Sequence, residues 1–536
     1  MNVQMLKGTS QLIKIISRQH RFQIIAWLMG IVFVSLAVAS SYQSVYQNES
    51  DKQGFALTMQ NPAMVAMLGP GYEADEYLLT IGTQFAHEML LFTLLAIAIM
   101  NILLVGSSTR TDEETGRTEV LRSLPIGRLS YLAASIIVVG CVNLIIALIT
   151  GIGLHLLNIE GNTLESSILY GAILGLGGFV FAAITSLFAQ ITDSSRGTKG
   201  LAFGTLVIAY FIRAVGDVVD EKISFFSPLG WLLRTDVFIN NYWWPIVISS
   251  IFSIVLIIIT FYLNSIRDLN SGFLPTRKGR TNASSMIKSI LGLVYHLQRI
   301  KIIAWGIGIF ALGAAFGAVM GDMEKYFSDN EFVQMMLAQM GDFSITDQFI
   351  SMLMGIMSLI SVIPVIMTIL KLKSEENHYR TEHFYSRAIS RNRVLGSFTV
   401  LAIIESIIYL MLLALGLWLA ANTMMENPIS FATIMQSALV YLPAMFFMIG
   451  VTVFLVGFAP KFTSVIWLYF AFCYVAVYVG GLLNFPEWIM YLSAFELIPK
   501  VPGEEVDIQS LFLLLVLFIV FLFIGFKGYN KRDIAG

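Results

Sequence analysis

Long apolar runs follow one another along the whole chain, separated by short polar stretches. A run of about 20 apolar residues is long enough for an α-helix to cross a hydrocarbon core of about 30 Å. The chain therefore predicts an all-α integral membrane protein with twelve transmembrane helices, at residues 22–42, 82–106, 129–157, 167–191, 200–216, 243–264, 302–321, 347–370, 394–421, 430–458, 462–484 and 508–527.

The composition agrees with this pattern. Of the 536 residues, 57% are hydrophobic and 13% are charged, and the mean hydropathy is +0.76. Soluble domains are about one-quarter charged, so this chain is far more apolar than they are. The first residues lack a compact apolar core followed by a small-residue cleavage site, so we expect no removable signal peptide.

The positive charges orient the predicted helices. If both termini are cytoplasmic, most of the 33 lysines and arginines lie on the cytoplasmic side, and most of the 35 acidic residues lie on the outer segments. Because basic residues concentrate in cytoplasmic loops, this orientation is the expected one. The six basic residues that fall elsewhere are Lys52, Arg213, Lys222, Arg234, Lys325 and Lys500. We expect a multi-pass protein of the plasma membrane with both termini inside the cell.

An apolar motif occurs twice, about half a chain apart. RFQIIAWLMG at Arg21–Gly30 returns as RIKIIAWGIG at Arg299–Gly308. Each half contains six predicted helices, an even number, so the halves have the same orientation and form parallel repeats of a kind common in transporters. A stretch rich in Gly, Ser and basic residues separates them. This predicts a first six-helix half at 1–270, a cytoplasmic linker at 271–285 and a second six-helix half at 286–536.

Each half also carries a charged inner segment after its second predicted helix, at residues 109–128 and 371–393. EETGRTEVLRSLPIGR in the first is echoed by EENHYRTEHFYSRAISR in the second, with one inserted residue. As a helix, 113–124 would place Glu113 four residues before Arg117, an order that favours pairing, and would align Val120, Leu121 and Leu124. We therefore expect a short amphipathic helix on the cytoplasmic face, although an ordinary solvated loop would show similar spacing.

Two further kinds of helix are expected at the membrane surfaces. Leu12–Arg21 and Met286–Arg299 combine Leu and Ile with basic residues, which predicts amphipathic helices lying in the inner interface. The outer segments before the last predicted helix of each half carry apolar and aromatic residues at roughly helical intervals. They predict short external helices.

The first inner segment resembles the coupling-helix signature of ATP-binding-cassette permeases of the type-2 exporter class. The matching positions are Glu113, Glu114, Gly116, Thr118, Glu119, Leu121, Ser123, Pro125 and Arg128. The fused double-length form and SPLGW at Ser227–Trp231 are similar to permeases that export polyketide antibiotics of the tetronasin type. In the second half, His378 and Tyr379 replace the glycine and no proline matches Pro125, so the resemblance is weaker there.

The resemblance implies that two copies of a cytoplasmic ATP-binding-cassette ATPase grip the inner segments and drive export of hydrophobic or amphipathic compounds such as antibiotics. The chain has no phosphate-binding loop of the G-x-x-x-x-G-K-[ST] type. ATP and Mg²⁺ therefore belong to the partner, this chain binds no cofactor and is not an enzyme, and no nucleic-acid partner is expected. The expected ATPase contacts are Glu113, Glu114, Gly116, Arg117, Glu119, Leu121, Arg122, Glu376, Arg380, Glu382 and Arg387.

Some polar and aromatic residues inside the predicted helices are candidates for a substrate pathway. Ionisable residues are costly in the hydrocarbon core and often functional. Glu405 fits that description, but a hydrogen bond to a neighbouring helix or a protonated carboxyl would also explain it. Glu88, with His87, would equally fit an interfacial polar pair. The full candidate set is Glu88, Tyr210, Phe211, Glu405, Phe470 and Tyr474, and for the aromatic members packing or lipid contact is the competing interpretation.

Glycines at intervals of four predict close helix packing. They occur at Gly313, Gly317 and Gly321, and at Gly171 and Gly175. The scattered His and Cys residues show no spacing typical of a metal site.

Two other classes of protein remain open from the sequence. A proton-driven secondary drug transporter of the major facilitator type would also have twelve helices in two parallel halves. A membrane protein that senses an antimicrobial or confers immunity without transport would need an external binding region, for which the sequence offers no large outer domain. An ATPase that copurifies with the chain would distinguish the exporter from both.

Overall fold

The computed structural model describes most of the chain. The described residues are 3–45, 52–53, 55–56, 59, 62–73, 76, 80–268, 271–274, 281–320, 345–387, 389–425, 429–479, 486–504 and 508–533. Every regular element within these ranges is helical. The chain divides into two compact units, Met1–Gly279 and Arg280–Gly536, and the boundary lies inside the predicted linker. Each unit is described by itself.

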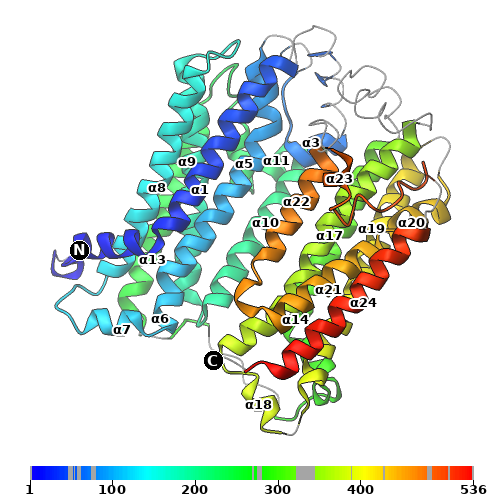
Figure 1. Cartoon of the computed structure of the whole chain (residues 1–536). Helices are drawn as coiled ribbons and strands as arrows, with labels where there is room; N and C mark the ends of the chain where they lie inside the picture. Colours follow the sequence, from blue (N-terminus) through cyan, green and yellow to red (C-terminus); the bar gives the residue numbers. More distant parts are fainter. Residues whose placement is uncertain are drawn as a thin grey trace. The chain divides into compact units, whose positions relative to one another are not determined.

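Unit 1 is built around one central helix, α9 (Leu164–Ile191), which packs against four other long helices (Figure 1). Its partners are α5 (Ile81–Gly106), α8 (Ser130–Leu156), α10 (Ser195–Val219) and α13 (Trp244–Ile266), while α1 (Thr9–Val45) packs on α8 and α5. A Cβ on Gly171 would lie 2.2 Å from the Ala147 carbonyl oxygen. The predicted close packing at Gly171 and Gly175 is confirmed, because only glycine lets α9 approach the α8 backbone this closely.

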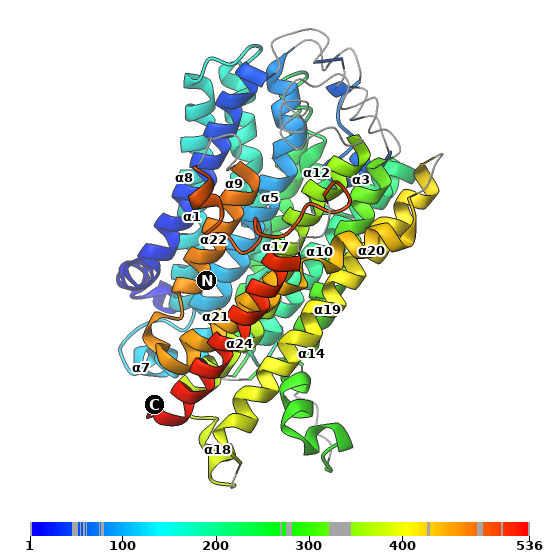
Figure 2. The ribbon, with the colours of Figure 1, turned by 45° about the vertical axis from the view of Figure 1, so that its right-hand side comes forward.

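Unit 2 contains α14 (Ile290–Val319), α17 (Ile345–Asn377), α19 (Arg391–Met424), α21 (Leu442–Phe458), α22 (Val465–Val479) and α24 (Ile508–Lys531). The helices α14 and α19 run side by side, as do α21 and α24 (Figure 2). Gly313 and Gly317 on α14 lie against backbone atoms of Leu413 and Leu417 on α19. This confirms the predicted close packing at those two glycines; Gly321 lies outside the described residues.

Eleven helices among the described residues are long and apolar enough to cross a membrane. The exception among the predicted spans is 462–484, where α22 has only 15 residues and the positions from 480 to 485 lie outside the described ranges. The predicted span 430–458 is interrupted: α20 (Phe431–Leu439) ends before α21 begins. Pro443 in the first turn of α21 has no N–H to donate, which favours a helix start there over an unbroken helix.

The surface helices only partly agree with expectation. Short helices occur in both outer segments, namely α11 (Glu221–Ser224), α12 (Pro228–Leu233) and α23 (Glu487–Met490), as predicted. The lead-in at Leu12–Arg21 is not a separate helix but the first part of α1, which runs from Thr9 to Val45. Figure 1 shows this first part at an angle to the rest of α1, and its place in the inner interface stays a prediction. No Gly or Pro between Thr9 and Arg21 interrupts α1, so the basic lead-in and the membrane-crossing part form one helix. In the second lead-in, η3 (Ser285–Lys288) precedes α14, which likewise continues into its span.

Candidate functional site: the two inner segments

The first inner segment begins where α5 leaves its apolar stretch. The helix continues through one π-helical turn, η2 (Ser107–Thr111), into α6 (Asp112–Glu114), and a second short helix, α7, spans Arg117–Arg122. Gly116 separates them with a left-handed backbone, φ 74°. The single helix predicted over 113–124 is therefore wrong. A residue without a Cβ takes the left-handed conformation at little cost and ends one helical run before the next starts.

This break changes the predicted ion pairing. Arg117 pairs with Asp112 at 2.9 Å instead of with Glu113, because the turn at Gly116 takes it off the helical face that carries Glu113. Asp112 is buried and also accepts hydrogen bonds from Tyr131 Oη at 2.5 Å and from Gln19 Nε2 at 3.2 Å. One carboxylate thus ties the segment to α8 and to α1.

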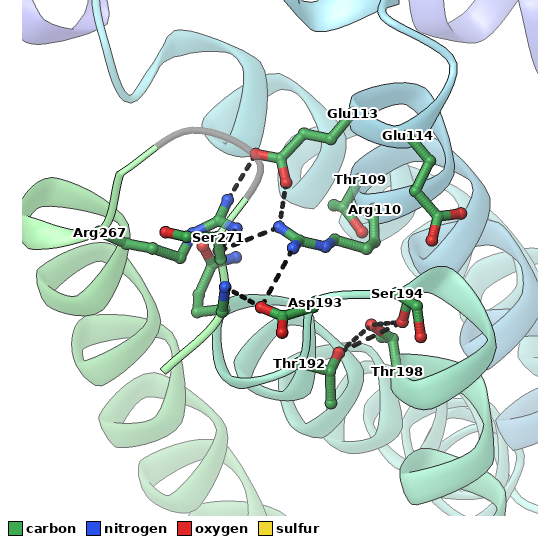
Figure 3. Close-up of polar contacts among 12 residues, drawn as sticks. Thr109, Arg110, Glu113, Glu114, Thr192, Asp193, Ser194, Thr198, Arg267 and Ser271 are labelled. Atoms are coloured by element: carbon green, nitrogen blue, oxygen red, sulfur yellow. Dashed lines mark hydrogen bonds and ion pairs between the residues drawn. The ribbon is translucent and has the colours of Figure 1, made fainter. Parts of the chain in front are cut away.

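Glu113 is buried and bridges two arginines (Figure 3). One carboxylate oxygen accepts from Arg110, which precedes it by one helical turn, and the other accepts from Arg267, directly after α13. Both guanidinium groups also donate to the Ser271 carbonyl oxygen, Arg267 at 2.7 Å and Arg110 at 3.3 Å. Arg110 lies 3.9 Å from Asp193 as well. The contacts of Glu113 are therefore internal to unit 1.

Glu114 also has a partner inside unit 1. Its Oε1 accepts the backbone N–H of Ser195, the first residue of α10, at 2.9 Å. A carboxylate at this position stabilises a helix N-terminus, where the N–H groups are otherwise unpaired. The hydroxyl groups of Thr111 and Ser195 add a second bond across the same junction, 2.6 Å long.

The outward surface of the segment is formed mainly by α7 and the residues that follow it. Glu119 is exposed, and the apolar side chains of Val120 and Leu124 are 71% and 54% exposed. Leu121 turns the other way and packs against the cluster formed by α1 and α8. Of the three residues predicted to share one apolar stripe, two face outward and one faces inward.

A depression of about 370 Å³ lies beside this surface, lined by Arg110, Glu113, Glu114, Thr115, Gly116, Glu119 and Asp193. Arg122 is half-buried on the other side of Glu113. Burial lowers the pKa of its guanidinium; Glu113 opposes that effect, and Arg128 and Arg267 lower the pKa further. The depression itself is acidic, because its lining contains four acidic residues and one arginine, Arg110.

The second inner segment repeats this construction in unit 2. After α17 ends, Tyr379 takes a left-handed backbone, φ 58°, and α18 (Glu382–Tyr385) follows. Arg380 pairs with Glu375 at 3.2 Å, and Arg532 pairs with Glu376 at 2.6 Å. Glu382, Arg380 and Arg387 are exposed.

Three contacts occur at matching positions in both units. An acid pairs with the arginine five residues later, as Asp112–Arg117 and Glu375–Arg380. The next acid pairs with the arginine directly after the last helix, as Glu113–Arg267 and Glu376–Arg532. The arginine at the end of each segment donates to the carbonyl oxygen of that same arginine, Arg128 to Arg267 at 2.7 Å and Arg391 to Arg532 at 2.6 Å.

Comparison with known proteins places the chain in a family. A family model described as the C-terminal domain of the multidrug efflux system permease Rv1217c matches residues 11–263 and 287–530. The chain belongs to this permease family. Multidrug efflux system permease protein Rv1217c of Mycobacterium tuberculosis (strain ATCC 25618 / H37Rv) is 29% identical over 533 residues, which cover 98% of this chain and 95% of that protein. The narrower resemblance to tetronasin-type exporters stays a prediction.

The intramembrane candidates of this permease are distributed over both units. In unit 1, Glu88 accepts a hydrogen bond from Tyr42, and Tyr210 donates to the Met67 carbonyl oxygen at 3.1 Å. The rings of Tyr210 and Phe211 meet edge to face, and Phe211 is 58% exposed. The structure brings these two neighbouring residues of α10 together, whereas Glu88 on α5 binds Tyr42 on α1.

In unit 2, Glu405 is buried and faces Lys301 at 3.6 Å and Thr368 Oγ1 at 2.7 Å. Lys301 also donates to the Pro364 carbonyl oxygen at 3.0 Å, so the group links α14, α17 and α19. Phe470 meets Trp467 edge to face, and Tyr474 is 38% exposed. The hydrogen-bonded interpretation of Glu405 agrees with this geometry.

Sequence reasoning missed three basic members of the site in the permease, Arg110, Arg267 and Arg532. Arg267 and Arg532 each follow the last predicted helix of a half, where a basic residue is ordinarily explained by the membrane interface alone. The sequence did contain a signal that could have revealed Arg267 and Arg532: they occupy matching positions relative to the two inner segments. Asp112 was missed because the resemblance begins one residue later, at Glu113, and Glu375 was left out of the expected contacts although the echo in the second half begins at it.

Proposed function

We propose that the chain is the permease subunit of an ATP-driven exporter of hydrophobic or amphipathic compounds, energised by two copies of a separate cassette ATPase. The ATPases would dock on the inner segments 109–128 and 371–393. In this proposal both termini are cytoplasmic, the protein lies in the plasma membrane, and the two units are parallel repeats.

The observation that carries the proposal is the matched construction of the two inner segments. Each is anchored by two acids at its start and by an arginine at its end, and each turns through a left-handed residue before a short helix. Such anchoring would hold a docking surface rigid, while exposed side chains of α7 and α18 remain available to a partner. Two similar surfaces in one chain suit two copies of one partner.

The relative's description as a multidrug efflux permease supports outward transport and drugs as the substrates. The docking chemistry also suits the partner. Exposed apolar side chains beside an acidic depression offer a buried contact surrounded by charges, which is the usual anatomy of a specific interface.

Copurification tests the proposal. The tagged chain is coexpressed with a candidate cassette ATPase of the same organism and extracted in mild detergent. We expect an assembly of one permease and two ATPase subunits whose ATP hydrolysis rises on addition of a hydrophobic dye. Failure of the ATPase to bind, together with dye transport that needs only a proton gradient, would overturn it.

One observation favours a second candidate. Lys301 and Glu405 form a buried ion pair inside the predicted membrane region of unit 2. Such pairs occur along proton and ion pathways, so proton-driven secondary transport is the alternative. Replacing both residues together, Lys301→Met with Glu405→Leu, would abolish a proton-driven activity but would leave ATP-driven transport in place if the variant folds.

A further inference from the structure

A buried acid in each inner segment forms an ion pair with the arginine that follows the last helix of its own unit. In unit 1 Glu113 binds Arg267, the residue that follows α13. In unit 2 Glu376 binds Arg532 at 2.6 Å, the residue that follows α24. We call these two ion pairs the clasps.

Each clasp arginine is held twice. Its guanidinium binds the acid near the start of the inner segment, and its backbone carbonyl oxygen accepts from the arginine at the end of that segment. The end of α13 is therefore fixed to Glu113 and to Arg128 at once, and the end of α24 to Glu376 and to Arg391. A segment that holds a helix end at two points cannot move without it unless these bonds break.

The clasps are buried, which distinguishes them from ordinary surface ion pairs. The side chains of Glu113 and Arg267 are 9% and 4% exposed, and those of Glu376 and Arg532 are 3% and 13% exposed. Exposed pairs contribute little, whereas removing one partner of a buried pair leaves an uncompensated charge. Tyr529 adds a hydrogen bond to Glu376 at 2.6 Å, which further satisfies that carboxylate.

The last helix of unit 2 has further hydrogen bonds to its inner segment: Tyr385 and Tyr529 share one, Asn530 donates to Asn392, and Arg391 donates to the carbonyl oxygens of Tyr529 and Asn530. The apolar stretches of α13 and α24 are only 17% and 11% buried, the lowest values together with α1. Within its unit α13 packs mainly on α9, and α24 mainly on α21. The clasps add buried ion pairs to the contacts between the inner segments and the ends of these two helices.

We propose that Glu113–Arg267 and Glu376–Arg532 transmit movement of the inner segments to the last helix of each unit, so that these four residues are positioning residues for transport. The inference rests on the proposed function, since an ATPase docked on the inner segments supplies the movement. A purely structural clasp would stabilise each unit without affecting how much transport each ATP supports.

The first test measures transport per ATP hydrolysed in the assembly with the ATPase, reconstituted in vesicles. Arg267→Gln and Arg532→Gln should retain the ATPase but lower transport per ATP at least about tenfold, because breaking a buried ion pair costs more than one factor of ten in equilibrium. Lys531→Gln, an exposed neighbour with the same charge change, should match the wild type. The exchanged pair Glu376→Arg with Arg532→Glu should recover part of the loss, because Glu376 has no second arginine in contact among the described residues, whereas Glu113 also binds Arg110.

Unchanged transport per ATP in both arginine variants would overturn the inference while leaving the proposed function intact. If the wild-type chain binds no ATPase, both proposals fall.

A second measurement does not depend on stable clasp variants. Spin labels at Asn377→Cys at the end of α17 and Lys531→Cys at the end of α24, both exposed positions outside the expected ATPase contacts, are placed in a chain with Cys141 and Cys473 replaced by Ala. In the assembly, the distance between the labels should stay constant with and without ATP, because the clasp moves both as one. A change of more than about 5 Å, roughly one helical turn, would show independent movement and contradict the inference.

Discussion

At the scale of single residues, the left-handed turn in each inner segment is kept although the residue changes. Gly116 and Tyr379 have φ values of 74° and 58°. The left-handed conformation costs a residue with a Cβ about 1–2 kcal/mol relative to the right-handed one, whereas glycine adopts both readily. Since no atom lies within 4 Å of a Cβ built on Gly116, the backbone angle alone explains the glycine.

Removing the glycine in unit 1 and introducing one in unit 2 should therefore have opposite effects on the free energy of unfolding. Gly116→Ala should lower the free energy of unfolding by about 1 kcal/mol. Tyr379→Gly, at a side chain that is 56% exposed, should leave it unchanged or raise it. Thermal unfolding in detergent measures both, and an equal loss in the two variants would show that side-chain contacts of Tyr379 matter more than its backbone.

A second residue-scale prediction concerns the amide pair inside unit 1. Asn101 and Asn143 exchange two hydrogen bonds, 3.0 and 2.7 Å long, between α5 and α8, and both are buried. Asn101→Leu leaves the partner amide unsatisfied and should lower the free energy of unfolding by about 1–3 kcal/mol. Replacing both residues by Leu should cost less than the sum of the single variants, as a double-mutant cycle would show.

At the scale of helices, the apolar pattern predicts the elements better than it predicts their ends. Runs of about 20 apolar residues mark eleven of the helices, because burial in lipid requires them. The pattern fails where local backbone chemistry decides. Gly116 divides the expected helix in the first inner segment, and Pro443 begins a new helix within the span predicted at 430–458. Both residues are visible in the sequence. The sequence alone, however, does not distinguish a Gly or Pro that ends a helix from one that a membrane helix tolerates.

Helix packing in unit 2 gives a matched pair of glycine variants. A Cβ on Gly313 would lie 2.4 Å from the Leu413 carbonyl oxygen, whereas a Cβ on Gly308 of the same helix would meet nothing within 4 Å. Gly313→Ala should destabilise the α14–α19 pair, because the backbone of α14 or α19 would have to shift to make room for the new Cβ. Gly308→Ala should be neutral or stabilising by up to about 1 kcal/mol. The melting temperatures of the two variants test this, and equal values would contradict the packing argument.

The exposed surface of α7 is the element-scale test of docking. Val120→Asp with Leu124→Asp places charges in the expected ATPase contact and should abolish capture of the ATPase without lowering yield or melting temperature. Phe226→Asp, at a side chain that is 81% exposed between α11 and α12, is the control. Undiminished capture by the double variant would exclude α7 as the docking surface.

At the scale of the whole chain, the candidate site was predictable in outline only. The echo between the two inner segments indicated their importance, and five of the predicted contact residues, Glu113, Glu114, Arg117, Glu376 and Arg380, lie in their polar networks. Their partners were not predictable, because pairs such as Glu113 with Arg267 join positions that are 154 residues apart and adjacent only in the fold. Of the five, Glu113 and Glu376 are buried, whereas Glu114, Arg117 and Arg380 are exposed. The outward docking surface therefore lacks two of the side chains that the sequence suggested.

The most direct test of the central claim is transport by inside-out vesicles that contain the chain with its cassette ATPase. We predict that uptake of a hydrophobic fluorescent dye requires both ATP and the ATPase subunit and continues when a protonophore collapses the proton gradient. Uptake that proceeds without the ATPase and stops with the protonophore would contradict the account.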